Sequence, residues 1–152
     1  MTQWLDEDEM AAWLPLIRIV HALPQELDRK LREEVGIPHN YYGMLATLSS
    51  QPDRTLTMGD LARLTASSPS RLSHAITALE QRGWVARRQC GEDKRRQFVT
   101  LTDDGLAMLE EVAPSHVAHV RQLVFDRLTP EQVRQLAAIG SAIVGNAELG
   151  EA

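Results

Sequence analysis

The stretch of sequence that decides the fold covers residues 57–101 and reads TMGDLARLTASSPSRLSHAITALEQRGWVARRQCGEDKRRQFVTL. It opens with Thr57, a residue type that caps a helix by accepting a hydrogen bond from the first turn. A short helix is predicted over residues 58–65, and residues 66–68 form a tight connection. From residue 70 to residue 82 the apolar residues recur at the spacing of one buried helix face. The stretch therefore predicts a helix-turn-helix.

The second of these helices carries a polar face opposite its apolar one. Pro69 suits the first turn of a helix, and Gly83 suits its end. Hydrogen-bonding residues gather toward the N-terminal end, and the first carboxylate comes only at Glu80. We interpret this face as a surface that reads the major groove of DNA, against the alternative of an ordinary solvated face. The candidate contact residues are Ser68, Ser70, Arg71, Ser73, His74 and Thr77.

A change of period follows Gly83. Residues 84–89 and 97–101 alternate apolar with polar side chains and are rich in strand-forming residues, which predicts a β-hairpin. A helix-turn-helix followed by a hairpin is a winged helix, and a basic hairpin tip suits the narrow minor groove. A solvated loop is the alternative, although it does not explain three consecutive cations. The candidate wing contacts are Arg87, Arg88, Lys94, Arg95 and Arg96.

Helices are predicted on both sides of this unit. Residues 7–35 and 40–50 have helical spacing, with Pro24 expected to kink or split the first of the two helices. Residues 102–147 are also expected to be helical, with Thr102 as a cap, an apolar face that runs to Leu128 and a last helix that starts at residues 129–131. These helices carry more apolar surface than a small DNA-binding core can cover, which predicts a dimer interface. The expected fold is mostly α with a small β-hairpin wing: a winged helix-turn-helix over 39–101 and a helical dimerisation region over 1–38 and 102–152.

Charge and composition limit the possible functions. The net charge is −5, but residues 71–96 hold seven arginine and lysine residues against three acidic ones, a local charge of +4. This basic segment between acidic flanks favours double-stranded DNA as a partner. The acidic N-terminus, the single cysteine and the lack of a long apolar run predict a cytoplasmic protein without a membrane contact. No phosphate loop, metal-ligand spacing or nucleophile beside a base is found, so neither an enzyme nor a cofactor is expected.

The chain resembles the MarR family of bacterial transcriptional regulators from about Trp13 to Val144. The wing sequence DKRRQFVTLT of residues 93–102 matches the family's signature, and residues 61–85 are similar to its helix-turn-helix. The segments RLSH (71–74) and APSH (113–116) resemble an actinobacterial-type branch. The resemblance implies a homodimer on a pseudo-palindromic operator, with Arg95 in the minor groove and Asp93 stabilising the wing. A winged helix that binds only proteins is the alternative function.

Several residues are candidates for sensing a signal. Many relatives bind a small aromatic anion between their dimerisation helices and DNA-binding lobe. Such an effector pocket would be lined here by Trp13, Ile17, His21, Tyr41 and Tyr42, unless these residues are packed core. Cys90 has both basic and acidic neighbours, which disfavours a redox role. His39, His116 and His119 lack a convincing set of further ligands, so no metal site is expected.

Overall fold

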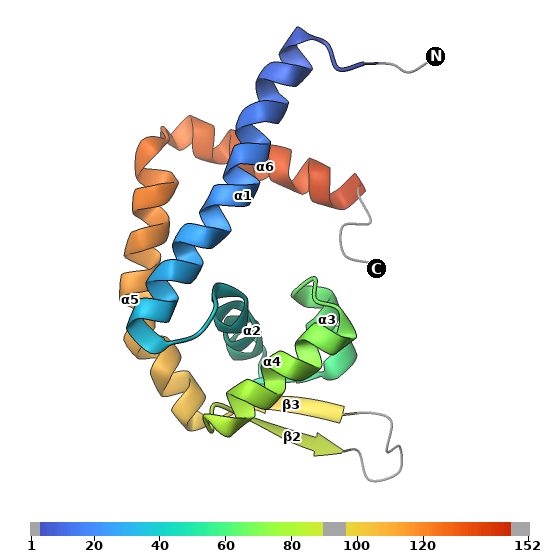
Figure 1. The fold of residues 1–152 in the computed structure, drawn as a ribbon, viewed down its shortest axis with the longest axis vertical. Helices are drawn as coiled ribbons and strands as arrows, with labels where there is room; N and C mark the ends of the chain where they lie inside the picture. The colour runs from blue at the N-terminus through green and yellow to red at the C-terminus, as the bar shows by residue number, and fades with distance from the viewer. Residues whose placement is uncertain (1–3, 90–96, 147–152) are drawn as a thin grey trace.

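The computed structural model describes residues 4–89 and 97–146, which form a winged helix joined to long helices (Figure 1). The elements in chain order are α1 (Glu7–Val35), α2 (His39–Ser49), β1 (Thr55–Thr57), α3 (Met58–Leu64), α4 (Pro69–Gln81), β2 (Val85–Gln89), β3 (Gln97–Leu101), α5 (Asp103–Leu123), the 3-10 turn η1 (Phe125–Arg127) and α6 (Pro130–Asn146). We call α2 to β3 the winged-helix lobe. The predicted fold class is confirmed.

Helix α1 is the longest element, with 29 residues. Asp6 caps its N-terminus, and Glu9 completes a reciprocal capping box. Pro24 does not split the helix, since the loss of one backbone hydrogen bond is small beside the many others in its length. The helix ends at Gly36, whose φ of 70° is a left-handed conformation that favours glycine.

The wing is part of a three-stranded antiparallel sheet in the order β1-β3-β2. Both strands of the predicted hairpin are present, with Val85 opposite Leu101. The third strand, β1, was not predicted from the sequence. It pairs Thr55 with Thr100, and their hydroxyl oxygens lie 2.8 Å apart.

One apolar core holds the lobe and the adjoining ends of two long helices together. Leu31 of α1, Leu45 of α2 and Ile76 of α4 are all fully buried. Met108 and Leu109 of α5 belong to the same cluster. The division into regions 1–38 plus 102–152 and 39–101 stays a prediction, and the core crosses both of its boundaries.

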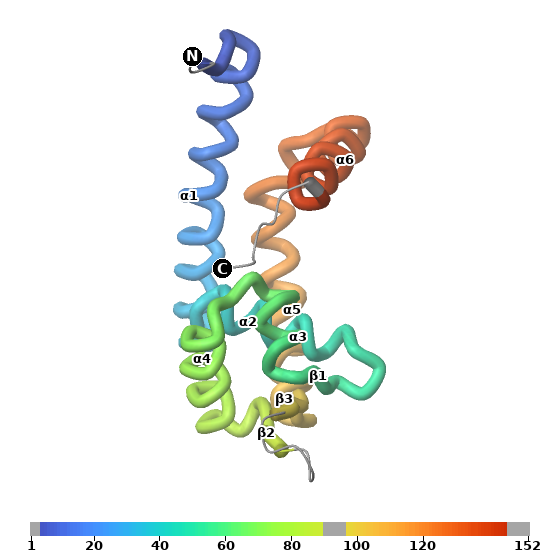
Figure 2. The backbone as a smooth tube through the Cα atoms, turned by 90° about the vertical axis from the view of Figure 1, so that its right-hand side faces the viewer, coloured from blue at the N-terminus to red at the C-terminus, as the bar shows by residue number. Residues whose placement is uncertain are grey.

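The rest of the long helices extends away from the lobe (Figures 1 and 2). Helix α5 ends at Leu123 and the chain turns through η1 into α6, so the apolar pattern to Leu128 does not form one continuous helix as expected. Among the described residues, α6 makes no extensive contact with another element. None of the described helices carries an apolar stretch long enough to span a bilayer.

Candidate DNA-binding surface

Helix α4 holds the predicted recognition residues, and its local sequence explains its position. The hydroxyl of Ser68 accepts a hydrogen bond from the backbone N–H of Arg71 at 3.4 Å, and Pro69 follows in the first turn. Leu72, Ile76 and Leu79 are buried against the rest of the lobe. This apolar face fixes the rotation of α4 about its axis, and therefore determines which side chains face solvent.

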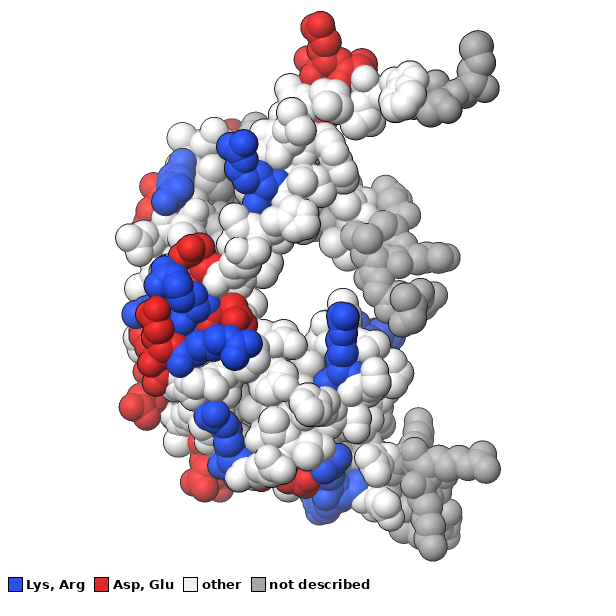
Figure 3. All heavy atoms as spheres, viewed as in Figure 1, with Lys and Arg blue, Asp and Glu red and all other residues white. Residues whose placement is uncertain are grey.

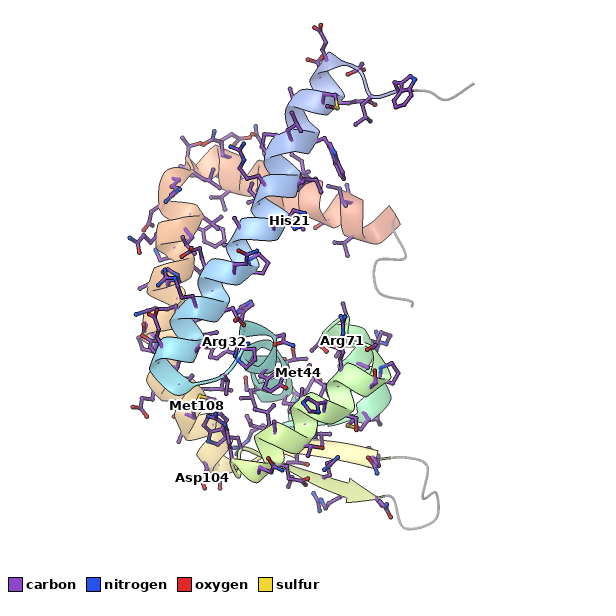
Figure 4. The ribbon with its side chains drawn as sticks, viewed as in Figure 1. His21, Arg32, Met44, Arg71, Asp104 and Met108 are labelled. Carbon is purple, nitrogen blue, oxygen red and sulfur yellow. The ribbon has the colours of Figure 1, made fainter. Side chains whose placement is uncertain are left out.

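The opposite face of α4 is exposed and polar. Ser70, Arg71, Ser73 and His74 are exposed, whereas Thr77 is half-buried and donates its hydroxyl to Ser73 O at 2.9 Å. Arg71 projects from the N-terminal end of α4, away from Met44 and Met108 in the core (Figure 4). The structure thus brings the predicted contact residues of this helix together on one surface, as the sequence implied.

Acidic and basic side chains are spread unevenly over the molecule. Carboxylates gather at the N-terminal end of α1 and mix with cations over its C-terminal half (Figure 3). Many of the latter are paired along the helix, as in the ion pair of Arg29 with Glu26 at 2.6 Å. At the rim of the hollow beside α4, the view shows blue side chains with no red ones next to them (Figure 3).

Arg87 is bound within the lobe. Its guanidinium donates to Glu80 Oε2 through Nε at 2.9 Å and through Nη2 at 2.7 Å, and its backbone N–H donates to Glu80 Oε1 at 3.1 Å. These hydrogen bonds hold the pKa of Glu80 below its ordinary value. The ion pair links α4 to the start of the wing. Arg88, another predicted wing cation, is exposed and lies opposite Phe98. The remaining wing cations, Lys94, Arg95 and Arg96, lie outside the described residues, as do Cys90 and Asp93.

The predicted effector-pocket residues fall into two groups. Trp13 is 46% exposed on the N-terminal half of α1, and Ile17 and His21 follow at one-turn spacing on the same helix. Tyr42 is in the core, 7% exposed, and Tyr41 packs against that core. A surface depression of about 330 Å³ is lined by none of these five residues; its walls are Asp53, Thr55, Arg88, Gln89 and Phe98.

Two of the candidate histidines meet where α2 contacts α5. The ring centroids of His39 and His116 lie 5.5 Å apart, and the ring of Tyr42 lies 4.4 Å from that of His116. Burial lowers the pKa of His39 and of His116. His39 Nδ1 and His119 Nε2 are buried without a hydrogen-bond partner. Among the described residues, no group of three or more His, Cys, Asp or Glu side chains is arranged to hold a metal ion.

One residue at the end of α4 was not singled out from the sequence as more than a cation. Arg82 donates to Val35 O at 2.9 Å and to Gly36 O at 3.1 Å. These acceptors lie 47 and 46 positions away in the chain, so no local pattern could have indicated them.

Comparisons with known proteins identify the family. The sequence model of the MarR family matches residues 35–96. The crystal structure of Sco3205, a MarR family transcriptional regulator from Streptomyces coelicolor in complex with DNA, is 43% identical, and the alignment covers 99% of this chain and 97% of that one with a TM-score of 0.91. AbsC, a MarR family transcriptional regulator from the same organism, is 36% identical over 95% of this chain and 100% of its own, with a TM-score of 0.83.

A comparison of sequences alone identifies a further relative. The transcriptional repressor MprA of Escherichia coli is 31% identical over 94 residues, which cover 62% of this chain and 53% of MprA. The chain thus spans about half the length of that relative. The resemblance seen in the wing and helix-turn-helix motifs is confirmed, and a DNA-binding regulator is favoured over a winged helix that binds only proteins. The chain belongs to the MarR family of transcriptional regulators.

Proposed function

We propose that the protein is a transcriptional repressor that binds double-stranded DNA as a homodimer, each protomer reading one half of a pseudo-palindromic operator. The observation that carries the proposal is the exposed face of α4. Arg71, Ser73 and His74 offer hydrogen bonds there, and the first carboxylate of the helix comes only at Glu80. Side chains of this kind read base edges in the major groove. The DNA complex of Sco3205 supports the same use of this lobe.

The homodimer is supported by apolar side chains that the described part of the chain leaves uncovered. On α1, Trp13, Leu14 and Val20 are 46%, 59% and 54% exposed, and on α6 Ile139 and Val144 are 57% and 63% exposed. A patch of this size on a soluble helix favours burial against a partner. An interface built from both helices would bury more than about 2,000 Å² in total, as in obligate dimers.

The wing supplies the second DNA contact. Arg88 is exposed on β2, and the sequence continues through Lys94, Arg95 and Arg96. The family resemblance implies that Asp93 stabilises the wing. An acidic dimer is repelled by DNA at long range, so local cations must provide the attraction. Arginine in the narrow minor groove fulfils this need.

A small aromatic anion is the proposed signal that releases the DNA. Trp13, Ile17 and His21 lie along one face of α1 and offer aromatic, aliphatic and hydrogen-bonding groups. A pocket of this make-up suits an aromatic ring with a polar substituent. Tyr41 and Tyr42 lie in the lobe, apart from these three residues, and Tyr42 is buried in the core, so the residues of α1 would make the contact with the ligand. We place the protein in the cytoplasm, in keeping with its single cysteine.

Selection of bound genomic fragments by the purified protein tests the function directly. We expect recovery of fragments that share an inverted repeat, and we expect Arg71→Ala to weaken binding to that repeat by about 1–3 kcal/mol and to blur the base preference at one position of each half. Arg29→Ala is the matched control, because Arg29 pairs with Glu26 and Glu33 on α1, away from α4.

Two outcomes would contradict parts of the proposal. Fragments without a shared repeat would refute a sequence-specific regulator. A variant Arg71→Ala that loses the same factor on operator and on scrambled DNA would make Arg71 a phosphate contact.

A further inference from the structure

Arg82 is the C-cap of α4, the proposed recognition helix, and its side chain hydrogen-bonds to the end of α1. Its guanidinium donates through Nη1 to Val35 O at 2.9 Å and through Nη2 to Gly36 O at 3.1 Å. Val35 is the last residue of α1 and Gly36 is its C-cap. At this end of a helix, carbonyls lack partners within the helix and carry partial negative charge. A planar guanidinium can serve two neighbouring carbonyls at once, so the contact fixes direction as well as distance.

Two neighbours lie close to the guanidinium of Arg82. Gly36 has a φ of 70°, and a Cβ at this position would be in ordinary van der Waals contact with Arg82 Nη2, at 3.4 Å. The guanidinium carbon lies 5.0 Å from the centroid of the Trp84 ring, within the range of a cation–π interaction. The side chain is therefore held from two sides, although it lies at the surface.

The same short segment also contacts α5. Thr102, the N-cap of α5, donates its hydroxyl to Gly83 O at 2.6 Å and its N–H to Trp84 O at 3.0 Å. Gly105 packs so closely on this segment that a Cβ there would lie 2.2 Å from Trp84 O. Residues 82–84 thus connect the end of α4 to both helices that extend beyond the lobe.

We infer that Arg82 is a positioning residue that sets the angle of the recognition helix to α1, and so sets the half-site spacing that the dimer accepts. The inference rests on the proposed homodimer. Arg82 lies eleven residues beyond Arg71, about 16 Å along the helix, so it acts at the end opposite the proposed base contacts. In the described parts of the chain, Arg82 makes both of the hydrogen bonds that join the end of α4 to the end of α1. Without these two hydrogen bonds, α4 keeps its packing in the lobe but loses this link to α1, the helix proposed to form part of the dimer interface.

Binding to a series of operators with the half-sites moved apart or together one base pair at a time tests this role. Wild type should show one preferred spacing. We expect Arg82→Ala to lose about tenfold in affinity at that spacing and little at its neighbours, so that the preference flattens. Arg82→Lys should behave like Arg82→Ala, because an ammonium does not form the planar two-carbonyl contact. The slope of log affinity against log salt should stay unchanged in both variants.

Arg32→Ala is the matched control. Arg32 is an exposed arginine in the last turn of α1 that pairs with Asp28 at 2.5 Å, and it should keep the wild-type spacing preference. Full spacing discrimination in Arg82→Ala would overturn the inference. Recovery of wild-type behaviour by Arg82→Lys, or a salt slope reduced by about 0.9 for each neutralised phosphate, would make Arg82 a phosphate ligand instead.

A measurement without DNA separates this inference from the proposed function. Spin labels on Ser73→Cys, in a chain whose sole cysteine is replaced by Cys90→Ser, report the distance between the two copies of α4 in a dimer. We expect a broader distance distribution in Arg82→Ala than in Arg32→Ala. An equal width would refute the role of Arg82 alone. The absence of any dipolar coupling in the otherwise wild-type chain would refute the homodimer and the inference together.

Discussion

The two halves of α1 share one helix but differ in what covers them. Near the C-terminal end, Leu27 and Leu31 are 7% and 0% exposed, because α2 and α5 pack over them. Near the N-terminal end, Leu14 is 59% exposed and Val20 is 54% exposed. Both halves place apolar residues at helical spacing, so the difference lies in the partner and not in the pattern.

This difference separates a self-sufficient part of the molecule from an incomplete one. The C-terminal half of α1 completes a core with the lobe and α5 inside a single chain. The N-terminal half and α6 present apolar faces that the described residues of the chain do not cover. A second copy of the chain could cover these faces. In a dimer with two-fold symmetry, each face would then occur twice in the interface. Substitutions in each part should therefore have effects of different kinds.

The largest effect is expected from a charge in the uncovered part. Leu136→Glu places a carboxylate on α6 at a leucine that is 46% exposed. In a two-fold interface the change occurs twice, and burying an unpaired carboxylate is strongly unfavourable. We expect the dimer to weaken by at least about 3 kcal/mol, which is more than a hundredfold in its dissociation constant. Sedimentation velocity across a range of concentrations measures this.

Leu64→Glu is the control for this change. Leu64 ends α3 and is 49% exposed, almost the same fraction as Leu136, but it lies in the winged-helix lobe. It should leave the dimer constant within about twofold. Equal weakening by both variants, or by neither, would contradict an interface built on α1 and α6.

The next effect concerns the covered half of α1. Leu31→Ala removes a fully buried side chain and should destabilise the fold by about 3 kcal/mol at every protein concentration. Leu14→Ala removes an exposed side chain of the same type, and its effect on Tm should depend on concentration, because it acts through association. Thermal unfolding at several concentrations distinguishes the two variants. A concentration-independent loss in Leu14→Ala would mean that this end of α1 packs within its own chain.

The fold was predictable where local patterns determine it. The caps Thr57 and Thr102 each act at the predicted helix start, because capping involves residues only three positions apart. The strand β1 was missed because Thr55–Thr57 is too short for an alternating pattern, and its pairing with β3 joins residues far apart in sequence. Pro24 was expected to kink or split its helix. Helix α1 nevertheless continues through this residue, because its 29 residues supply many other backbone hydrogen bonds.

The site was predictable as a face but not residue by residue. The exposed side of α4 follows from helical spacing, so Arg71 and His74 were found together. In the local charge count, Arg82, Arg87 and Arg88 contribute equally as cations. In the fold, Arg87 pairs with Glu80 and Arg82 hydrogen-bonds to the end of α1. Such pairings arise from tertiary contacts, which a short stretch of sequence does not contain.

The smallest expected effect is a pH dependence at the junction between lobe and α5. Burial lowers the pKa of His39 and of His116 below 6.5, and the proximity of the two rings adds to the effect at His116. The unfolded chain therefore binds protons at a pH where the folded chain does not, so stability falls as the pH drops below about 6.5. We expect Tm to decrease modestly between about pH 8 and about pH 5.5.

The groups that face the pair allow the cause to be isolated. Asp28 and Glu34 of α1 favour the charged imidazoles and oppose the effect. Their own pKa values are lowered from the ordinary carboxyl value, so they stay ionised throughout this window. Tyr42 of α2 has a pKa raised by burial and stays neutral. The double variant His39→Gln, His116→Gln should flatten the decrease in Tm because it removes both imidazoles, whereas His74→Gln on the exposed face of α4 should retain it. A slope that survives the double variant would assign the pH dependence to groups other than these two imidazoles.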